Sequence, residues 1–241
     1  MQFPDPLLRG TLIKRYKRFL ADVTLAGDGD ADSVVTAHCP NPGSMMGLSS
    51  PGSEVWLSPA RNPERKLRYT WELLRFDSRL VGINTAHPNK LVEEAIADGV
   101  IAELSGYDSV RREVRYGKNS RIDLLLAGAG RPDCFVEIKN VHLKRDPPGD
   151  RGAAEFPDSV TKRGAKHLVE LSDMVAAGNR AVMVYVVQRE DCDYFTLADD
   201  IDPTYAETFA KARAAGVEAI CYTCKITVDG IHLAAALPIS Q

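Results

Sequence analysis

The chain has 241 residues, of which 44% are hydrophobic and 26% are charged, and its formal net charge at pH 7 is −3. This composition is ordinary for a globular protein and excludes a collagenous, mucin-like or wholly disordered chain. The longest apolar run, Ala181–Val187, has seven residues, whereas a membrane-spanning helix needs about 20. The N-terminus lacks the basic and apolar segments of a secretory signal, so we expect a cytoplasmic protein that does not enter a membrane.

The first third of the chain is predicted to form a small β-barrel. Short β-prone runs alternate with turn sequences such as Asn41-Pro-Gly-Ser and Ser50-Pro-Gly-Ser, and no helical pattern interrupts them. Five short strands joined by tight turns are typical of an OB-type barrel. We expect these strands at residues 8–19, 34–38, 54–58, 66–76 and 80–83, in a domain of residues 1–83.

The remaining residues, 84–241, are predicted to form a mixed sheet covered by helices, which makes the whole chain α+β. Asn89 is a suitable N-cap and Gly99 a suitable stop for the first helix. A polar stretch at residues 142–157 is long enough to be a functional flap. In chain order we expect a helix at 90–98, strands at 109–116, 121–127 and 134–141, a helix at 159–177, a strand at 181–187, a helix at 203–214 and a strand at 218–228.

Two of these strands carry charged residues among apolar ones. Asp123 interrupts one apolar run, and Glu137 and Lys139 alternate with apolar residues in the next strand. The strand period of two places Glu137 and Lys139 on one face, and a hairpin between the strands would bring Asp123 beside Glu137. Two buried carboxylates repel each other and are costly to desolvate. Mg²⁺ or Mn²⁺, which favour oxygen ligands, would relieve both costs.

The spacing of Asp123, Glu137 and Lys139 resembles the PD-(D/E)XK nuclease motif, and the predicted αβββαβ order resembles the core of that superfamily. In such a site Asp123 and Glu137 would hold the metal ion, which activates water and neutralises phosphate charge. Lys139 would bind the phosphate or polarise the water. We therefore expect these three residues to be catalytic; an exposed charged pair on an edge strand is the alternative for Glu137 and Lys139. Pro132-Asp133 spells the letters PD, but Asp133 is too near Glu137 in sequence to be the second ligand.

Basic residues in three segments are candidates for binding nucleic-acid phosphates. Residues 14–19 of the barrel combine four cations with two aromatic side chains that could stack on bases. The helix at 159–177 adds three side chains on one stripe, and the flap adds further cations. Aromatic residues in the barrel core and solvated helix and loop surfaces are the alternatives. His167 lies at the border of the apolar stripe of its helix, so a semi-buried histidine with a satisfied partner is a further alternative for it. The candidates are Lys14, Arg15, Lys17, Arg18, Lys144, Arg145, Arg163, Lys166 and His167.

The five cysteines are too few and too scattered for a disulfide framework. Cys221-Tyr-Thr-Cys224 is a lone CxxC sequence, and further ligands at zinc spacing are missing. We interpret the pair as two cysteines of a strand.

Six blocks of sequence together resemble the sugar fermentation stimulation protein A family, nearly from end to end. The resemblance implies an OB-like domain followed by a nuclease-like domain in which the two acids and the lysine named above are the nuclease-like residues. It also implies DNA binding with little sequence preference, a regulatory link to sugar metabolism, and a helix-turn-helix near the C-terminus. In place of the second helix of that motif, residues 218–226 favour a strand. Residues 27–32 are expected to form a longer hairpin turn than is usual in the family. The blocks are residues 12–23, 37–45, 84–89, 121–123, 136–141 and 156–168.

The sequence thus supports two main hypotheses. The first is a DNA-binding protein with a nuclease-like site that uses Mg²⁺ or Mn²⁺ to cleave phosphodiesters. The second is a non-cleaving, sequence-nonspecific DNA-binding regulator built on a nuclease fold. A small-molecule phosphate enzyme with the same site is a third. DNA is the expected partner, with RNA or single strands as further candidates.

Overall fold

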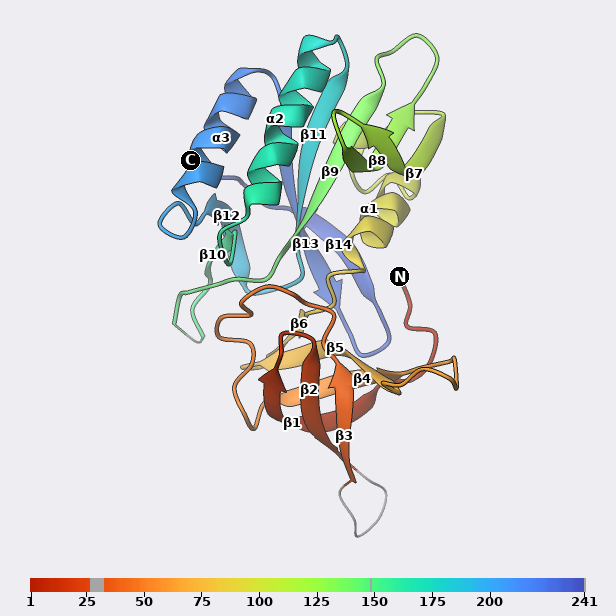
Figure 1. Cartoon of the computed structure of the whole chain (residues 1–241), viewed down its shortest axis with the longest axis vertical. Helices are drawn as coiled ribbons and strands as arrows, with labels where there is room; N and C mark the ends of the chain where they lie inside the picture. The colour runs from red at the N-terminus through yellow and green to blue at the C-terminus, as the bar shows by residue number, and fades with distance from the viewer. Residues whose placement is uncertain (27–32, 148, 241) are drawn as a thin grey trace.

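The computed structural model describes residues 1–26, 33–147 and 149–240. Two domains are stacked along the long axis, with a barrel at one end and a sheet flanked by helices at the other (Figure 1). The expectation about the turn at 27–32 lies outside the described residues. Within the described residues, no helix is both long and apolar enough to span a membrane.

The N-terminal domain is an OB barrel, as predicted. Five strands close on themselves because β3 and β5 also pair, through His38 and Thr70, and a sixth strand extends from β5. Its interior is apolar and includes Trp71 and Leu57, both fully buried. The strands are β1 (Leu8–Tyr16), β2 (Leu20–Leu25), β3 (Ser33–His38), β4 (Glu54–Pro59), β5 (Tyr69–Phe76) and β6 (Arg79–Gly82).

The prediction of one continuous strand over residues 8–19 is wrong. The chain turns back after Tyr16, and β1 pairs with β2 as a hairpin. Lys17, Arg18 and Phe19 form the connection, and Lys17 and Arg18 adopt φ of 50° and 63° in the left-handed region. The cations of this segment are therefore divided between the end of a strand and an exposed turn.

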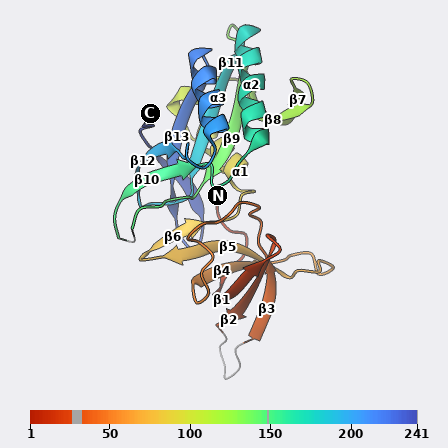
Figure 2. The ribbon, with the colours of Figure 1, turned by 60° about the vertical axis from the view of Figure 1, so that its left-hand side comes forward.

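The C-terminal domain is a mixed six-stranded sheet with strand order β14-β13-β11-β9-β8-β7. The three central strands are parallel and the outer pairings are antiparallel. One helix covers one face, and two helices cover the other (Figure 1 and Figure 2). The strands are β7 (Ser109–Tyr116), β8 (Ser120–Ala127), β9 (Cys134–Val141), β11 (Arg180–Val187), β13 (Glu218–Ile226) and β14 (Ile231–Ala236); the helices are α1 (Pro88–Ala97), α2 (Lys162–Ala176) and α3 (Pro203–Ala214), with a short 3₁₀ turn at Ala102–Leu104.

The sheet separates two apolar cores. Along β11, Val182 and Val184 pack with α1 on one face, whereas Met183 and Tyr185 pack with α2 and α3 on the other. Both faces of β11 are buried, which explains its continuous apolar sequence. The α+β fold with a mixed sheet between helices is confirmed.

The segment predicted as a long polar flap contains regular structure. Within it, β10 (Gly152–Phe156) pairs in parallel with β12 (Cys192–Leu197). The following helix begins at Lys162 instead of residue 159, and Thr161 is its N-cap, because the Thr161 side chain accepts the Gly164 N–H at 3.0 Å. The αβββαβ order is therefore interrupted by one short strand before α2.

Near the C-terminus the helix-turn-strand expectation is confirmed. β13 follows α3 after a short turn at Gly216, whose φ of 101° ends the helix. The N-cap of α1 is His87, so Asn89 lies inside the first turn of that helix rather than capping it. Its side chain is thus free to contact the neighbouring sheet.

Candidate functional site

Asp123 and Glu137 lie opposite each other where the ladder between β8 and β9 ends. The ladder between these strands pairs Leu124 with Val136, so Asp123 and Glu137 are next in the same register. The ladder ends there because the Asp123 carboxylate takes the place of a main-chain acceptor. Its Oδ2 accepts the Ile138 N–H at 2.7 Å. The strand pair therefore brings two acidic residues together, with Asp123 bonded to a residue of α1 and Glu137 to a residue of α2.

Glu137 is a buried anion with one unsatisfied oxygen. The residue is 2% exposed, and its Oε1 accepts Lys139 Nζ at 2.7 Å and also contacts Nδ1 of His167. Burial alone would raise the pKa of Glu137, but the bond to His167 and the charge of Lys139 lower it. Oε2 has no hydrogen-bond partner among the described residues, which is costly for a buried polar atom.

Asp123 is held between the sheet and α1. Its Oδ1 accepts Asn89 Nδ2 at 2.9 Å. Burial and the nearby charge of Glu137 raise the pKa of Asp123 to about 6, despite the hydrogen bonds from Ile138 and Asn89. Repulsion between two close carboxylates has this effect, and a cation between them would remove it.

The donor set fits a hard divalent cation. Mg²⁺ is commonly bound through one or two carboxylates and keeps several waters, and the unsatisfied Oε2 of Glu137 supplies a free anionic oxygen. In the part of the chain that the structure describes, no group of three or more His, Cys, Asp or Glu side chains has a metal-binding arrangement. Asp123 and Glu137 would thus supply two ligands, and water or substrate oxygens would complete the shell.

His167 belongs to this site rather than to the protein surface. It is 3% exposed and reaches Glu137 from α2. With its proton on Nδ1, the ring donates to Glu137 and accepts Arg163 Nε at Nε2, over 3.3 Å. The sequence indicated its position at the border of an apolar stripe but gave no sign of its partner.

Tyr116 completes the buried surroundings of the acids. The residue is 8% exposed, and its hydroxyl has no partner among the described residues. Burial, followed by the charges of Glu137, Glu170 and Asp123, raises its pKa strongly, so the hydroxyl stays protonated. Neither the role of Tyr116 nor that of Asn89 follows from the sequence: Asn89 is predicted to be a helix cap, and nothing in the sequence points to Tyr116.

Three of the cations predicted to contact nucleic acid have structural partners or are buried. The Arg15 guanidinium donates to three main-chain carbonyls of the loop at 41–44, two of them at 2.8 and 2.9 Å. Lys144 is only 7% exposed. Arg145 forms ion pairs with two carboxylates, at 2.7 and 2.6 Å. None of these three side chains is a free surface cation.

The other predicted contacts lie on the surface. Lys14 is exposed at the end of β1 and lies 3.5 Å from Asp22, while Lys17 and Arg18 project from the adjacent turn. Lys166 on α2 is exposed, and its Nζ donates to Ser120 Oγ at 3.2 Å. For these cations, contact with nucleic acid stays a prediction.

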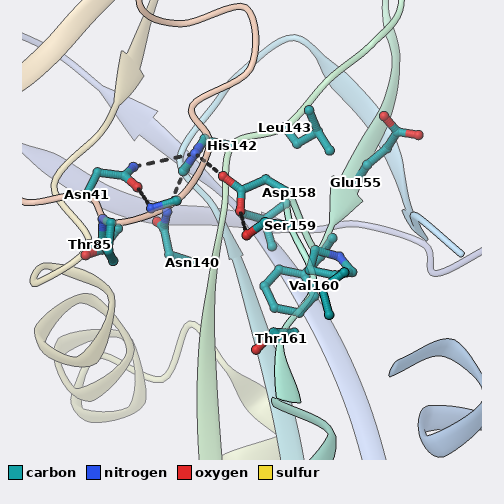
Figure 3. A pocket seen from close by; sticks show the side chains of 15 residues that line it. Asn41, Thr85, Asn140, His142, Leu143, Glu155, Asp158, Ser159, Val160 and Thr161 are labelled. Carbon is teal, nitrogen blue, oxygen red and sulfur yellow. Dashed lines mark hydrogen bonds and ion pairs between the residues drawn. The ribbon is translucent and has the colours of Figure 1, made fainter. Parts of the chain in front are cut away.

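A polar cluster lines a pocket between the two domains (Figure 3), with a volume of about 270 Å³. His142, just after β9, lies 2.7 Å from Asn140 Nδ2 and 3.6 Å from Asp158. Asn41 of the barrel approaches the same ring at 3.5 Å. Burial would raise the pKa of Asp158, but the bond to and charge of His142 lower it to about 2. These groups satisfy one another and connect the barrel to the sheet.

A second connection joins β6 to the end of β11. The Gly82 N–H donates to the Gln188 carbonyl at 3.0 Å. The Gln188 side chain, fully buried, donates to Asn140 Oδ1 at 2.6 Å and to the Asn84 carbonyl at 3.1 Å. The barrel and the sheet are thus hydrogen-bonded through main chain and side chains together.

Cys221 and Cys224 do not form a metal-binding pair. Both are buried free thiols of β13, and they belong to opposite cores, Cys221 on the side of α2 and α3 and Cys224 on the side of α1. Their interpretation as strand cysteines is confirmed.

Comparison with known proteins gives consistent matches over the whole chain. The family model "Sugar fermentation stimulation protein RE domain" matches residues 86–230, and "SfsA N-terminal OB domain" matches residues 13–83. A sugar fermentation stimulation protein homolog of Paramagnetospirillum magneticum is 64% identical over 237 residues, covering 98% of this chain and 97% of the relative. A homolog from Maricaulis maris is 56% identical and covers 100% of both chains. The solved structure of Pyrococcus furiosus SfsA in complex with Ca²⁺ is 26% identical with a TM-score of 0.87, covering 100% of this chain and 98% of that one.

Proposed function

The chain belongs to the sugar fermentation stimulation protein family, and we propose that it binds nucleic acid and cleaves phosphodiesters at a divalent-cation site formed by Asp123, Glu137 and Lys139. The observation that carries the proposal is the buried Oε2 of Glu137, which has no partner among the described residues and lies beside a second carboxylate.

Mg²⁺ or Mn²⁺ is the cation class that these oxygen ligands suit. The Ca²⁺ complex of the Pyrococcus furiosus relative supports binding of a hard divalent cation within the family. When bound, such an ion would neutralise phosphate charge and lower the pKa of a coordinated water.

The protein's own groups would divide the remaining work. His167, itself in contact with Arg163, holds Oε1 of Glu137 and so leaves Oε2 directed to the site. The Lys139 side chain is 15% exposed, so its ammonium can reach a phosphate oxygen or orient an attacking water at the edge of the site. Asn89 and the Ile138 N–H keep Asp123 in place.

The OB barrel supports the choice of nucleic acid as the partner. Barrels of this type present a strand surface and loops to oligonucleotides. Here the turn between β1 and β2 exposes Lys17, Arg18 and Phe19, and Phe19 is 48% exposed. Cations beside an exposed aromatic ring suit a backbone and its unstacked bases.

The test is a nuclease panel in which labelled duplex DNA, single-stranded DNA and RNA are each incubated with Mg²⁺, Mn²⁺, Ca²⁺ or a chelator. Cleavage by the wild type should require Mg²⁺ or Mn²⁺ and should fall by about 100-fold or more in Asp123→Asn and Lys139→Ala. Asp133→Asn is the matched control, because this acid lies on the turn before β9 and outside the cluster. It should leave the rate unchanged.

Intact substrate under every metal would contradict cleavage, as would full activity in Asp123→Asn. Salt-sensitive binding without cleavage would favour the non-cleaving regulator instead. In that case the carboxylate pair would still be expected to bind the cation, which can be measured calorimetrically.

A further inference from the structure

The turn between β7 and β8 carries a group of exposed basic side chains. Arg115, Lys118 and Arg121 are all exposed, and among the described residues none of them makes an ion pair or a side-chain hydrogen bond. Arg115 and Arg121 lie opposite each other in the ladder. Residues 115–121 together line a hollow of about 560 Å³. The hairpin therefore offers a concave surface that carries three positive charges.

The opposite face of this hairpin is anchored to α2. Tyr116 and Ser120 pair across the strands and are buried, and Lys166 Nζ donates to Ser120 Oγ at 3.2 Å. Glu170 Oε1 accepts the Lys118 N–H at 3.3 Å. At Gly117, where φ is +55°, a Cβ atom would lie 2.9 Å from the Glu170 carboxylate, so the turn closes tightly on the helix. The cations are thus presented from a fixed support.

The same hairpin leads directly to the carboxylate site. Arg121 precedes Asp123 by two residues on β8, and Tyr116 lies within the electrostatic reach of Asp123 and Glu137. Because the net charge of the chain is −3, this local excess of cations is not a consequence of a generally basic protein.

We propose that the β7–β8 turn binds the sugar–phosphate backbone of nucleic acid and guides it to the carboxylate site. This inference rests on the proposed function, which identifies nucleic acid as the partner. The inference adds the protein surface that binds that nucleic acid. Exposed guanidinium groups suit phosphate oxygens, and backbone contacts position a nucleic acid without reading its sequence. Arg15 and Arg145 are bonded within the protein and Lys144 is buried, so the hairpin adds a grip beside the carboxylate site to the one that the β1–β2 turn offers.

The experiment compares two double variants with equal loss of charge. Arg115→Ser with Arg121→Ser removes the paired guanidinium groups of the hairpin. Lys211→Ser with Lys225→Ser removes two exposed lysines from α3 and β13. Binding of a fluorescein-labelled DNA duplex is followed by fluorescence anisotropy over a series of salt concentrations, in chelator so that no cleavage intervenes. Thermal unfolding of both variants confirms that each is folded.

The hairpin variant should bind more weakly, and the slope of log affinity against log salt should be smaller by about 0.9 for each phosphate that the protein no longer neutralises. The lysine variant should keep the wild-type slope. An unchanged slope in the hairpin variant would overturn the proposal, and so would equal weakening in both variants, since the effect would then reflect net charge alone. Cleavage that survives Asp123→Asn would refute the catalytic site but would not affect this result, because binding is measured without metal.

Discussion

The charge on Asp123 destabilises the folded, cation-free protein, and the structure gives the size of the effect. The pKa of Asp123 rises from 3.8 to about 6. Each pKa unit corresponds to about 1.4 kcal/mol, so ionisation of this group in the folded chain costs about 3 kcal/mol. Because the folded-state pKa lies above the unfolded value, the cost is absent below about pH 4, grows as the pH rises to about 6 and is complete above that.

Asp123→Asn removes this cost while keeping the shape of the side chain. The new Oδ1 can still accept the Ile138 N–H, and the Asn89 amide can turn over so that its own oxygen accepts from the new Nδ2. In chelator at about pH 7 the variant should therefore be more stable than the wild type, by up to about 3 kcal/mol. The difference should disappear at about pH 4, where Asp123 is protonated in both states.

Urea unfolding in chelator and in Mn²⁺ measures both effects, with Asp133→Asn as the control. A ligand that binds only the folded state adds about 2.7 kcal/mol at a free concentration about 100 times its Kd. Mn²⁺ should therefore stabilise the wild type and the control but not Asp123→Asn. A variant less stable than the wild type in chelator at about pH 7, or equal stabilisation of all three proteins by Mn²⁺, would refute the reasoning.

Two other side chains have measurable structural roles. Arg15→Ala should lower the free energy of unfolding by about 1–3 kcal/mol, because it leaves the loop carbonyls of residues 41–44 without their charged donor. The affinity of this variant for duplex DNA should hardly change. Weaker DNA binding with unchanged stability would contradict this structural role. Burial would raise the pKa of Asp158, but His142 together with the hydrogen bonds from Met45 and Ser44 lowers it from 3.8 to about 2. This net shift stabilises the fold by about 2 kcal/mol above about pH 4, and the gain is lost as the pH falls towards 2. Asp158→Asn should therefore be less stable near neutral pH and show a flatter acid-unfolding profile, and parallel profiles for the two proteins would exclude the pair.

The sequence locates the carboxylate pair because local pattern decides its position. Alternating polarity places Glu137 and Lys139 on one face of a strand, and the short connection to the strand of Asp123 leaves a hairpin as the simplest arrangement. The structure has these strands within one residue of the predicted bounds. Neither the splaying of the strands at Asp123 nor the role of Asn89 has a sequence signature, because both depend on contacts between separate elements.

Other features could not be predicted because tertiary contacts override local preference. Lys17 and Arg18 adopt left-handed conformations that neither residue type favours, so local pattern predicts one strand where the structure has a hairpin. Lysine is rarely buried, which places Lys144 on the surface of a predicted flap, yet the folded chain leaves only 7% of it exposed. The helical stripe puts His167 at the border of the helix surface, and only packing of α2 on the sheet shows that it contacts Glu137.

The bonds between β6 and the end of β11 have a mechanical consequence. Gly82 and Gln188 join the barrel to the end of a strand that is buried on both faces, so rotation of one domain against the other would break this main-chain hydrogen bond and the bond from the Gln188 side chain to the Asn84 carbonyl. A nucleic acid held by the barrel would then meet the carboxylates at a constant offset along its length. Cleavage by two domains fixed in this way would occur at a constant number of nucleotides from the segment that the barrel binds. Two domains joined by a flexible linker would instead cut at variable distances from that segment.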